Sequence, residues 1–287
     1  MNLSRSVFDE LRQLIHRLCG LVVDDDKAYL IRHRLGPVAR TAGCRSFEEL
    51  AQKLRGPEGA ALHASIVEAI TTAETSFFRD GHPFEAFRCH LLPRLGEKAR
   101  AGVKVRLWCA AASTGQEPYS LAMLLHDYLT ANRGVGLRKS DFSILATDIS
   151  ERVLATARAA EYGDRDVARG LTPAVLARHL EKRHGVWAVR EPVRRLVDFR
   201  RLNLTGPLID LPAFDAIFCR NLLIYFDLDA RRRICRNLHN LLTDGGWLVL
   251  GAAENLYGVS EQFESLRLGD ALVYRKAAPD GRCAPET

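Results

Sequence analysis

The sequence contains no long hydrophobic run. A helix that crosses a membrane needs about 20 consecutive apolar residues, and no such stretch occurs among the 287 residues. Near the start of the chain, Arg5, Asp9 and Glu10 interrupt any apolar core of the kind that a signal peptide has. The sequence therefore predicts a cytoplasmic protein that does not insert into membranes.

Paired cysteines and catalytic triads are also missing. The seven cysteines are dispersed and odd in number, and none forms a C-x-x-C pair. This spacing is typical of reduced thiols in a cytosolic protein, and it favours neither a disulfide framework nor a metal site. There is no Cys/His or Ser/His/Asp constellation either. The sequence therefore predicts no metal and no base-activated nucleophile.

Charge of one sign does not dominate. The chain has 41 Lys and Arg against 35 Asp and Glu, a net charge of +6, and its arginines are widely spread. This balance is weak evidence for nucleic acid and better evidence for an acidic protein partner, so we expect no nucleic-acid substrate. The length indicates one large domain or two modest ones, and a monomer is the default expectation.

The most informative segment is Trp108–Met123. An apolar run over 103–107 precedes it, small residues fill Ala110–Gln116, and leucines then recur at helical spacing. Strand, tight turn and helix in this order open a nucleotide-binding α/β unit, because small residues and a helix start let a ligand approach the backbone. The glycine fingerprint of dehydrogenases and the P-loop are both absent. From this segment alone, a tight turn without a ligand is an equal alternative.

Residues 1–70 predict a small domain of four helices, since apolar residues recur there at helical spacing. Gly20 ends the first helix, and Ser46 begins the third with Glu49 in a capping box. The second helix carries the basic side chains Lys27, Arg32, His33, Arg34 and Arg40. The pattern leaves two interpretations open, which are a solvated basic face and a docking surface for an acidic helix.

Residues 71–83 are predicted to be a linker into a second domain. Phe77 and Phe78 would anchor the linker to that domain, and Thr75 and Arg79 would then face a ligand. The alternative is a linker that is held by its phenylalanines and contacts no ligand.

A second predicted strand, Phe142–Thr147, ends at Asp148. In α/β folds an acidic residue at this position holds the ribose of a nucleoside, because a carboxylate accepts hydrogen bonds from both hydroxyls. The alternative is that Asp148 or Ser150 caps the next helix, Glu151–Ala160. Together with the preceding turn, the pattern favours the ligand.

Residues 161–202 differ in composition and pattern from the segments on either side. They are rich in arginine and contain short alternating pieces at 187–189 and 196–199, which predict a small inserted β element with a helix over Pro173–Lys182. Such an insertion serves partner recognition or merely covers the domain, and the sequence does not decide between the two.

Arg220 and Asn221 follow a buried-type strand, Ala216–Cys219. They fall at its carboxyl end, where open α/β sheets bind ligands. The remaining predicted elements are a helix that includes Leu242 and ends at Gly245, a strand over 247–250, a hairpin over 263–275 and a disordered tail over 277–287.

Five motifs occur in the order TTAETSFFRD, STGQEPYSLAM, ATDIS, RNLLIYFD and GGWLVLGAAE. In this combination the chain resembles the chemotaxis receptor methyltransferase family (CheR) over nearly its whole length. The resemblance implies S-adenosylmethionine as cofactor, S-adenosylhomocysteine as product, and methylation of glutamates on the cytoplasmic domain of methyl-accepting chemotaxis receptors. It also implies an α/β fold class: a Rossmann-like methyltransferase domain over 84–276 with a seven-stranded mixed sheet, an inserted β-subdomain at about 163–200, and the N-terminal all-helical domain.

The resemblance further implies the residues of the site. Arg79 and Tyr225 would lie closest to the transferred methyl group, and Asp148 would hold the ribose. The other implied cofactor-binding positions are Ala73, Thr75, Glu117, Asn203, Leu204, Arg220 and Asn221, together with Arg79 itself. The family commonly has asparagine at the position of Ala73. It has glycine at the position of Ala111, so this chain places a methyl group in the tight turn.

Methyl transfer to a glutamate needs no general base, because a side chain with a pKa of about 4.3 is ionised at neutral pH. Arg79 would position the carboxylate, and Tyr225 would orient it or flank the cationic methyl group. Receptor helices that carry glutamates are acidic, so Arg32, Arg34 and Arg40 are predicted to dock them. Whether the β-subdomain also holds a C-terminal receptor peptide is left open.

Two other functions remain possible from the sequence. One is a methyltransferase of the same fold that acts on a small molecule or RNA, against which the helical domain argues. The other is a non-catalytic module that binds S-adenosylmethionine or its product and reports to a signalling partner, for which only Ala73 and Ala111 argue.

Overall fold

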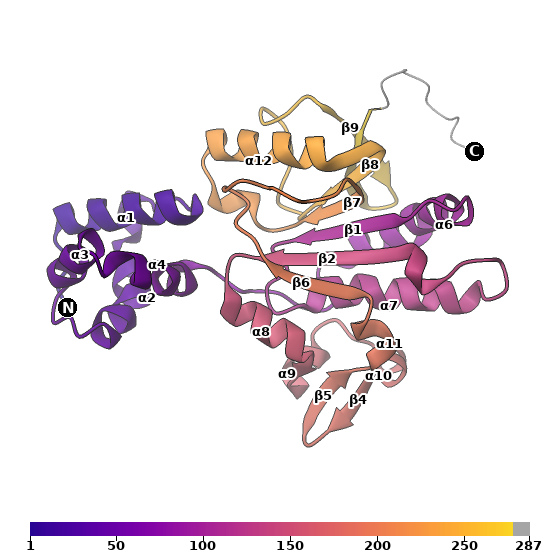
Figure 1. Cartoon of the computed structure of the whole chain (residues 1–287), viewed down its shortest axis with the longest axis horizontal. Coiled ribbons are helices and arrows are strands. Elements are labelled where there is room, and N and C mark those ends of the chain that lie inside the picture. Colours follow the sequence, from indigo (N-terminus) through magenta and orange to yellow (C-terminus); the bar gives the residue numbers. More distant parts are fainter. Residues whose placement is uncertain (278–287) are drawn as a thin grey trace.

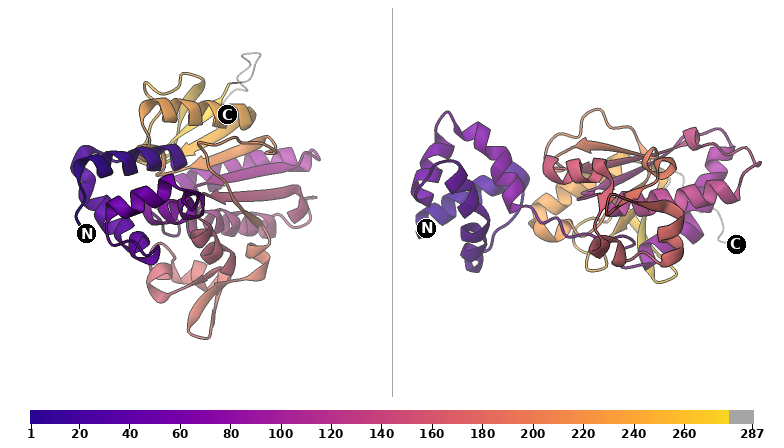
Figure 2. Two further views of the ribbon diagram at one scale, coloured as in Figure 1. Left: turned by 60° about the vertical axis from the view of Figure 1, so that its left-hand side comes forward. Right: turned by 90° about the horizontal axis from the view of Figure 1, so that it is seen from below.

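The computed structural model describes residues 1–277 of the chain. Its N-terminal helices stand beside a larger α/β domain and are joined to it by one extended linker (Figures 1 and 2). Within these residues, none of the helices combines the length and the apolar character that crossing a membrane requires. The N-terminal helices are α1 (Arg5–Cys19), α2 (Ala28–Thr41), α3 (Phe47–Arg55) and α4 (Gly59–Ile70).

Local signals at the helix ends determine this helical domain. The hydroxyl of Ser46 accepts the N–H of Glu49 at 3.2 Å, which is one half of the predicted capping box, whereas the carboxylate of Glu49 accepts the N–H of Arg45 at 2.7 Å instead of that of Ser46. Gly20 ends α1 with a φ of 74°. The apolar faces of the helices meet in one buried cluster that includes Phe8 and Ile31. The four predicted helices are therefore confirmed.

One mixed sheet forms the centre of the α/β domain. Its strands are β1 (Val105–Ala110), β2 (Phe142–Asp148), β6 (Val197–Arg201), β7 (Phe214–Cys219), β8 (Leu242–Leu250), β9 (Phe263–Leu268) and β10 (Ala271–Lys276). They lie in the order β6-β2-β1-β7-β8-β10-β9, and only the pairings made by β10 are antiparallel. The chain builds one half of the sheet from β1 outward and then crosses to β7. The carboxyl ends of β1 and β7 therefore flank a topological switch point, where open α/β sheets bind ligands.

Helices cover both faces of this sheet (Figure 1). They are α5 (His82–Ala86), α6 (Leu92–Arg100), α7 (Gln116–Ala131), α8 (Glu151–Ala159) and α12 (Leu228–Leu241), and a π-helical turn over 87–91 joins α5 to α6. Because side chains alternate along a strand, the central strand β1 serves two cores. Leu107 and Cys109 pack with α6 and α7, whereas Trp108 and Ala110 pack with α12.

A small three-stranded antiparallel sheet is inserted between α8 and β6, at the lower edge of Figure 1. Its strand order is β3-β5-β4, and short helices surround it. The inserted elements are β3 (Glu161–Tyr162), α9 (Asp164–Ala168), α10 (Pro173–His179), β4 (Leu180–Arg183), β5 (Val186–Val189) and α11 (Glu191–Arg194).

Two predictions for this insertion are wrong. The helix predicted over Pro173–Lys182 ends at His179, because the next residues pair with β5 as strand β4. The alternating piece at 196–199 belongs to the large sheet, where Phe199 of β6 lies opposite Ala146 of β2. The large sheet thus resumes before the predicted limit of about 200. A short alternating strand fits either sheet, and its pattern does not specify its partner.

The junction between α12 and β8 also differs from the prediction. The helix ends just before Leu242, which begins β8 and lies opposite Phe214 of β7. Gly245 and Gly246 do not end the helix but lie within the strand, beside a register shift in its pairing with β7. The predicted closing hairpin is confirmed as β9 and β10. The prediction of a disordered tail falls on residues 278–287, outside the described part of the chain.

Candidate active site

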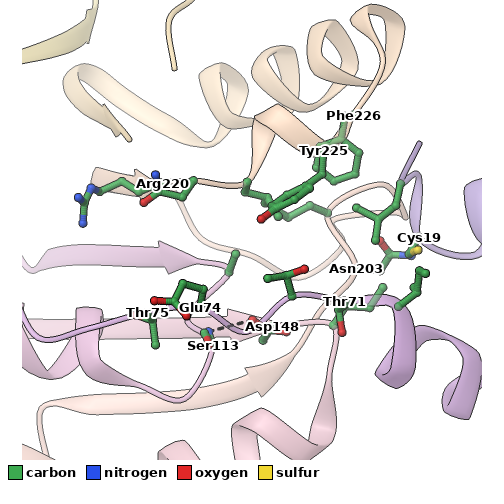
Figure 3. A pocket seen from close by; sticks show the side chains of 18 of the residues that line it. Cys19, Thr71, Glu74, Thr75, Ser113, Asp148, Asn203, Arg220, Tyr225 and Phe226 are labelled. Atoms are coloured by element: carbon green, nitrogen blue, oxygen red, sulfur yellow. Dashed lines mark hydrogen bonds between the residues drawn. The ribbon is translucent and has the colours of Figure 1, made fainter. Parts of the chain in front are cut away.

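A pocket lies where the helical domain, the linker and the carboxyl ends of β1, β2 and β7 meet (Figure 3). Every one of these elements contributes side chains to its wall. The linker residues that line it are Thr71, Thr72, Glu74, Thr75 and Arg79. This is the position that the switch point of the sheet predicts for a ligand.

The turn between β1 and α7 forms one wall of the pocket. The strand runs on to Ala110, beyond its predicted end, and the turn that follows has left-handed backbone at Ala111 and Ser113. The N–H of Ser113 donates to Oδ2 of Asp148 at 2.9 Å, and its hydroxyl donates to the carbonyl of Ala73 at 2.9 Å. This one residue thereby ties the ends of two strands to the linker.

We expect replacement of Ala111 by glycine to stabilise the protein. Ala111 has a φ of 70°, and a Cβ atom in the left-handed region costs about 1–2 kcal/mol. Glycine removes this strain, while its greater freedom in the unfolded chain offsets part of the gain. The net increase in the free energy of unfolding should be about 0.5–1 kcal/mol, measured by urea denaturation. The neighbouring change Ala112→Gly, at a buried residue without a positive φ, should lower stability, and a destabilised Ala111→Gly protein would contradict this expectation.

Asp148 closes β2 and faces the pocket. Besides the bond from Ser113, its Oδ1 accepts the N–H of Ser150 at 3.0 Å. Burial raises the pKa of Asp148, and these backbone N–H groups act in the opposite direction. The cap of α8 is Ser150, whose hydroxyl accepts the N–H of Val153 at 3.3 Å. The carboxylate of Asp148 is therefore not used as a helix cap and remains available to a ligand.

Arg220, at the end of β7, is buried, and both of its terminal nitrogens donate to acceptors of the protein. Its guanidinium donates to the carboxylate of Glu117 at 2.9 Å and to that of Asp80 at 2.8 Å. It also donates to the carbonyl of Arg79 at 2.7 Å. Burial raises the pKa of Glu117, and the charge of Arg220 opposes that effect. Arg220 thus shapes the pocket by holding α7 and the linker together.

The loop after β7 is held by a residue that sequence analysis did not single out. The carboxylate of Glu254 accepts the backbone N–H groups of Asn221 at 2.6 Å, Leu222 at 2.8 Å and Leu223 at 2.7 Å. These bonds fix the start of the loop that carries Tyr225, a pocket residue that is 38% exposed. The last letter of the motif GGWLVLGAAE is this glutamate, but the motif does not reveal what it binds.

The helical domain forms the far wall of the pocket, which sequence analysis also missed. The N–H of Val22 donates to the carbonyl of Tyr225 at 3.0 Å, and Nδ2 of Asn203 donates to the carbonyl of Leu18 at 2.9 Å. The lining residues from this domain are Cys19, Leu21, Val22, Val23, Leu30 and Ile70. In the sequence these residues follow an ordinary core pattern, so no signal separates them from the interior of the helical domain.

The structure brings nearly all of the predicted site together. The pocket is lined by Thr75, Arg79, Glu117, Asp148, Asn203, Leu204, Arg220, Asn221 and Tyr225. Ala73 is not among the lining residues, and its backbone carbonyl is occupied by Ser113.

The predicted docking residues lie on α2, outside this pocket. Arg32 and Arg40 are exposed to solvent. Arg34 is half-buried, and its guanidinium donates to the carbonyls of Ala69 at 3.4 Å and Thr71 at 3.2 Å. Arg34 therefore supports the start of the linker, whatever its part in docking.

Among the described residues, one group of side chains has the composition of a metal site. Donor atoms of His126, Asp127 and His179 lie within 4.8 Å of one another at the contact of α7 with α10. Arg178, however, already pairs with the carboxylate of Asp127 at 3.0 Å. Burial lowers the pKa of His126, and the charges of His179 and Lys139 act in the same direction. This positive surrounding disfavours a cation, and we assign no ion to the group.

The strand order and the pocket define the class of the protein. The domain is a Rossmann-like, S-adenosylmethionine-dependent methyltransferase domain with a seven-stranded mixed sheet. The chain belongs to the CheR methyltransferase family. The model of the family's SAM-binding domain matches residues 73–271, and that of its all-alpha domain matches residues 6–71.

Curated relatives match the chain over almost its whole length. Chemotaxis protein methyltransferase 1 of Pseudomonas aeruginosa is 38% identical over 276 residues, which cover 96% of this chain and 99% of that protein. The chemotaxis protein methyltransferase of Escherichia coli is 34% identical and covers 91% of this chain and 88% of its own. Among solved structures, the N-methyltransferase NodS of Bradyrhizobium japonicum covers 69% of this chain and 99% of its own at 14% identity, with a TM-score of 0.37, too low to carry a functional comparison.

Proposed function

We propose that this chain transfers the methyl group of S-adenosylmethionine to glutamate side chains on the cytoplasmic helices of chemoreceptors, giving glutamate methyl esters. The observation that carries the proposal is that chemotaxis methyltransferases match the chain through its helical domain as well as its cofactor domain. Many methyltransferases with different substrates have a cofactor pocket. The helical domain is the part that chemotaxis methyltransferases would share because they recognise the same kind of substrate.

The residues of the pocket fit the cofactor. A carboxylate has about four acceptor positions, and the two backbone hydrogen bonds to Asp148 leave room for the two ribose hydroxyls. Leu204 and Asn203 would border the adenine, and Asn221 would complete the wall beside it. Thr75, Arg79 and Glu117 would enclose the methionine part, with Ala73 behind them. Methyl transfer would leave S-adenosylhomocysteine in the same pocket.

The cofactor supplies an electrophilic methyl group on a positively charged sulfur. The protein then has to align a carboxylate oxygen with that group and to exclude water, and alignment at roughly 3–3.5 Å contributes several kcal/mol. Arg79 is suited to hold the carboxylate, since within residues 1–277 its guanidinium pairs with no acidic side chain. Arg79 must bind the substrate carboxylate only weakly, because this carboxylate loses its charge on methylation and a tight ion pair in the ground state would raise the barrier to transfer.

The partly exposed ring of Tyr225 is suited to orient the same oxygen or to flank the cationic methyl group. Comparing turnover with cofactor affinity in Arg79→Ala and Tyr225→Phe tests both roles. Unchanged turnover in Arg79→Ala removes Arg79 from the mechanism, and unchanged turnover in Tyr225→Phe removes the hydroxyl of Tyr225 and leaves the ring as its contribution.

Receptor docking by α2 gives a quantitative prediction. Reversing the charge of the two exposed residues, as Arg32→Glu with Arg40→Glu, should raise the KM for a receptor fragment about three- to tenfold at low salt, because exposed ion pairs contribute up to about 1 kcal/mol each. The effect should shrink as salt is added. Reversing the charges of Arg236 on α12 and Arg267 on β9, which are also exposed, provides a matched control of equal net charge. Equal KM values for the two double variants would exclude α2 as the docking surface.

A substrate panel tests the proposed reaction. Labelled methyl transfer should occur with a receptor cytoplasmic fragment, and should be lost when its candidate glutamates are changed to glutamine. RNA and small carboxylic acids should accept no label. Transfer to RNA or to small acids, with none to any receptor fragment, would overturn the proposal.

A further inference from the structure

The inserted subdomain contacts the linker beside the pocket. The guanidinium of Arg169, in the turn between α9 and α10, donates to Oε1 of Glu74 at 2.7 Å. Next to it, Gly170 has a φ of 98°, and a Cβ atom there would lie 1.8 Å from the carbonyl oxygen of Phe77. The turn therefore packs directly against the linker, and only glycine permits this approach.

Glu74 is a pocket residue with an ionised side chain. It lines the same wall as Thr75 and Ser113 (Figure 3). The hydrogen bond from Arg169 is the largest cause that lowers the pKa of Glu74, the charge of Arg169 comes next, and the charge of Arg79 adds to both. Glu74 is thus an anionic carboxylate in the field of two arginines, and among residues 1–277 only Arg169 forms an ion pair with it.

Arg79 lies on the same linker and is tied to Glu74 through the backbone. Its guanidinium donates to the carbonyl of Glu74 at 2.9 Å. Under the proposed function, Arg79 receives the carboxylate of the substrate glutamate. The side chain of Glu74 is a carboxylate of the same kind, attached to the same segment and free to turn about its own side-chain bonds if its partner is removed. It is therefore a built-in competitor for Arg79.

We propose that Arg169 is a positioning residue that holds the carboxylate of Glu74 away from Arg79, so that Arg79 stays open to the substrate carboxylate. The inference rests on the proposed function, since it takes the substrate to be a carboxylate. It gives the inserted subdomain a part in the reaction itself, because the turn that carries Arg169 belongs to that subdomain.

The competition has a kinetic signature. When Glu74 occupies Arg79 in a fraction of the molecules, only the remainder accept substrate, so the KM rises while a saturating substrate restores the full kcat. Because the Arg169–Glu74 pair is more than half exposed, with side chains 61% and 56% accessible, the effect is modest. A purely structural loss would instead lower kcat or weaken cofactor binding.

The test compares Arg169→Ala with the double variant Arg169→Ala/Glu74→Gln, using a receptor cytoplasmic fragment as substrate. We expect Arg169→Ala to raise the KM for the fragment about threefold, to leave kcat unchanged, and to leave the Kd of S-adenosylhomocysteine unchanged. Removing the charge of Glu74 in the double variant should return the KM to the value of Glu74→Gln alone. Arg88→Ala is the matched control, because Arg88 pairs with Glu85 at the same 2.7 Å with similar exposure and lines no part of the pocket.

The outcomes separate this inference from the function on which it rests. If wild-type protein methylates the fragment and the double variant is no better than Arg169→Ala, Arg169 acts only by packing the linker and the inference is wrong. The same conclusion follows if Arg169→Ala has the KM of the wild type. If wild-type protein binds S-adenosylhomocysteine but methylates no receptor fragment, the proposed function fails, and this inference fails with it.

Discussion

Replacing Asp148 with asparagine is expected to weaken the binding of S-adenosylhomocysteine about 30-fold or more. Both oxygens of Asp148 accept backbone N–H groups, from Ser113 and Ser150. An asparagine must turn its NH₂ group toward one of these donors, and it also loses the charge that strengthens hydrogen bonds to the ribose. Hydrogen bonds to a charged group contribute about 1.5–3 kcal/mol each, which corresponds to about 10–150-fold in affinity. Isothermal titration calorimetry measures the effect without turnover.

The matched control is Asp198→Asn, on the neighbouring strand β6, where the side chain is 63% exposed and away from the pocket. The wild-type protein should also lose affinity as the pH is lowered toward the pKa of Asp148, because burial raises that pKa and the protonated acid accepts fewer hydrogen bonds. Asp148→Asn should lack this pH dependence. Equal affinity of Asp148→Asn and the wild type would place the ribose elsewhere.

The largest loss of stability is expected for Arg220→Met. This change leaves the carboxylate of Glu117 buried without its partner, and breaking a buried ion pair in this way costs about 3–5 kcal/mol. The variant also loses the bonds from Arg220 to the carbonyl of Arg79 and to Asp80. Urea unfolding followed by tryptophan fluorescence reports this loss, because Trp108 and Trp247 lie in the large sheet.

A second substitution and the pH distinguish this mechanism from general disruption. Glu117→Gln in the Arg220→Met background should recover part of the stability, since the buried, unpaired charge of Glu117 is then removed. The deficit of the single variant should also shrink on acidification, because Glu117 without Arg220 has a further raised pKa and becomes neutral as the pH falls through it. A deficit that is independent of pH and is not relieved by Glu117→Gln would attribute the loss to packing alone.

The parts of the site that sequence predicted are those tied to strand ends. Asp148 and Arg220 each follow a recognisable buried strand, and parallel strands bring their carboxyl ends to one edge of the sheet. Residue type and position in the topology therefore place both side chains at the pocket. The chemistry of Arg220 was less predictable, because its partners come from two other elements, α7 and the linker.

The parts that sequence did not predict depend on contacts between distant segments. Glu254 binds three backbone N–H groups after β7, and no residue near Glu254 in the sequence indicates that it contacts this loop. The sequence of β6 predicts the wrong sheet for this strand, because an alternating pattern specifies a buried face and not the strand with which it pairs. The apolar wall from the helical domain, with Val22 bonded to Tyr225, follows the same pattern as ordinary core residues.

The departures at Ala73 and Ala111 have different consequences. Ala73 contributes its backbone carbonyl to Ser113, a contact that any residue can make, so the change removes no bond that holds the linker. Ala111 carries real strain, because its left-handed backbone is retained although a Cβ atom is present. The turn keeps its shape through the bonds of Ser113 to Asp148 and Ala73.

The chemical nature of the transferred label tests the central claim most directly. Wild-type protein is incubated with methyl-labelled S-adenosylmethionine and a receptor cytoplasmic fragment, and the labelled fragment is then treated with alkali. The proposed function predicts that the label leaves as methanol, because a glutamate methyl ester is hydrolysed by base. Label that stays on the fragment in alkali, or no transfer to any receptor fragment by protein that binds the cofactor, would contradict it.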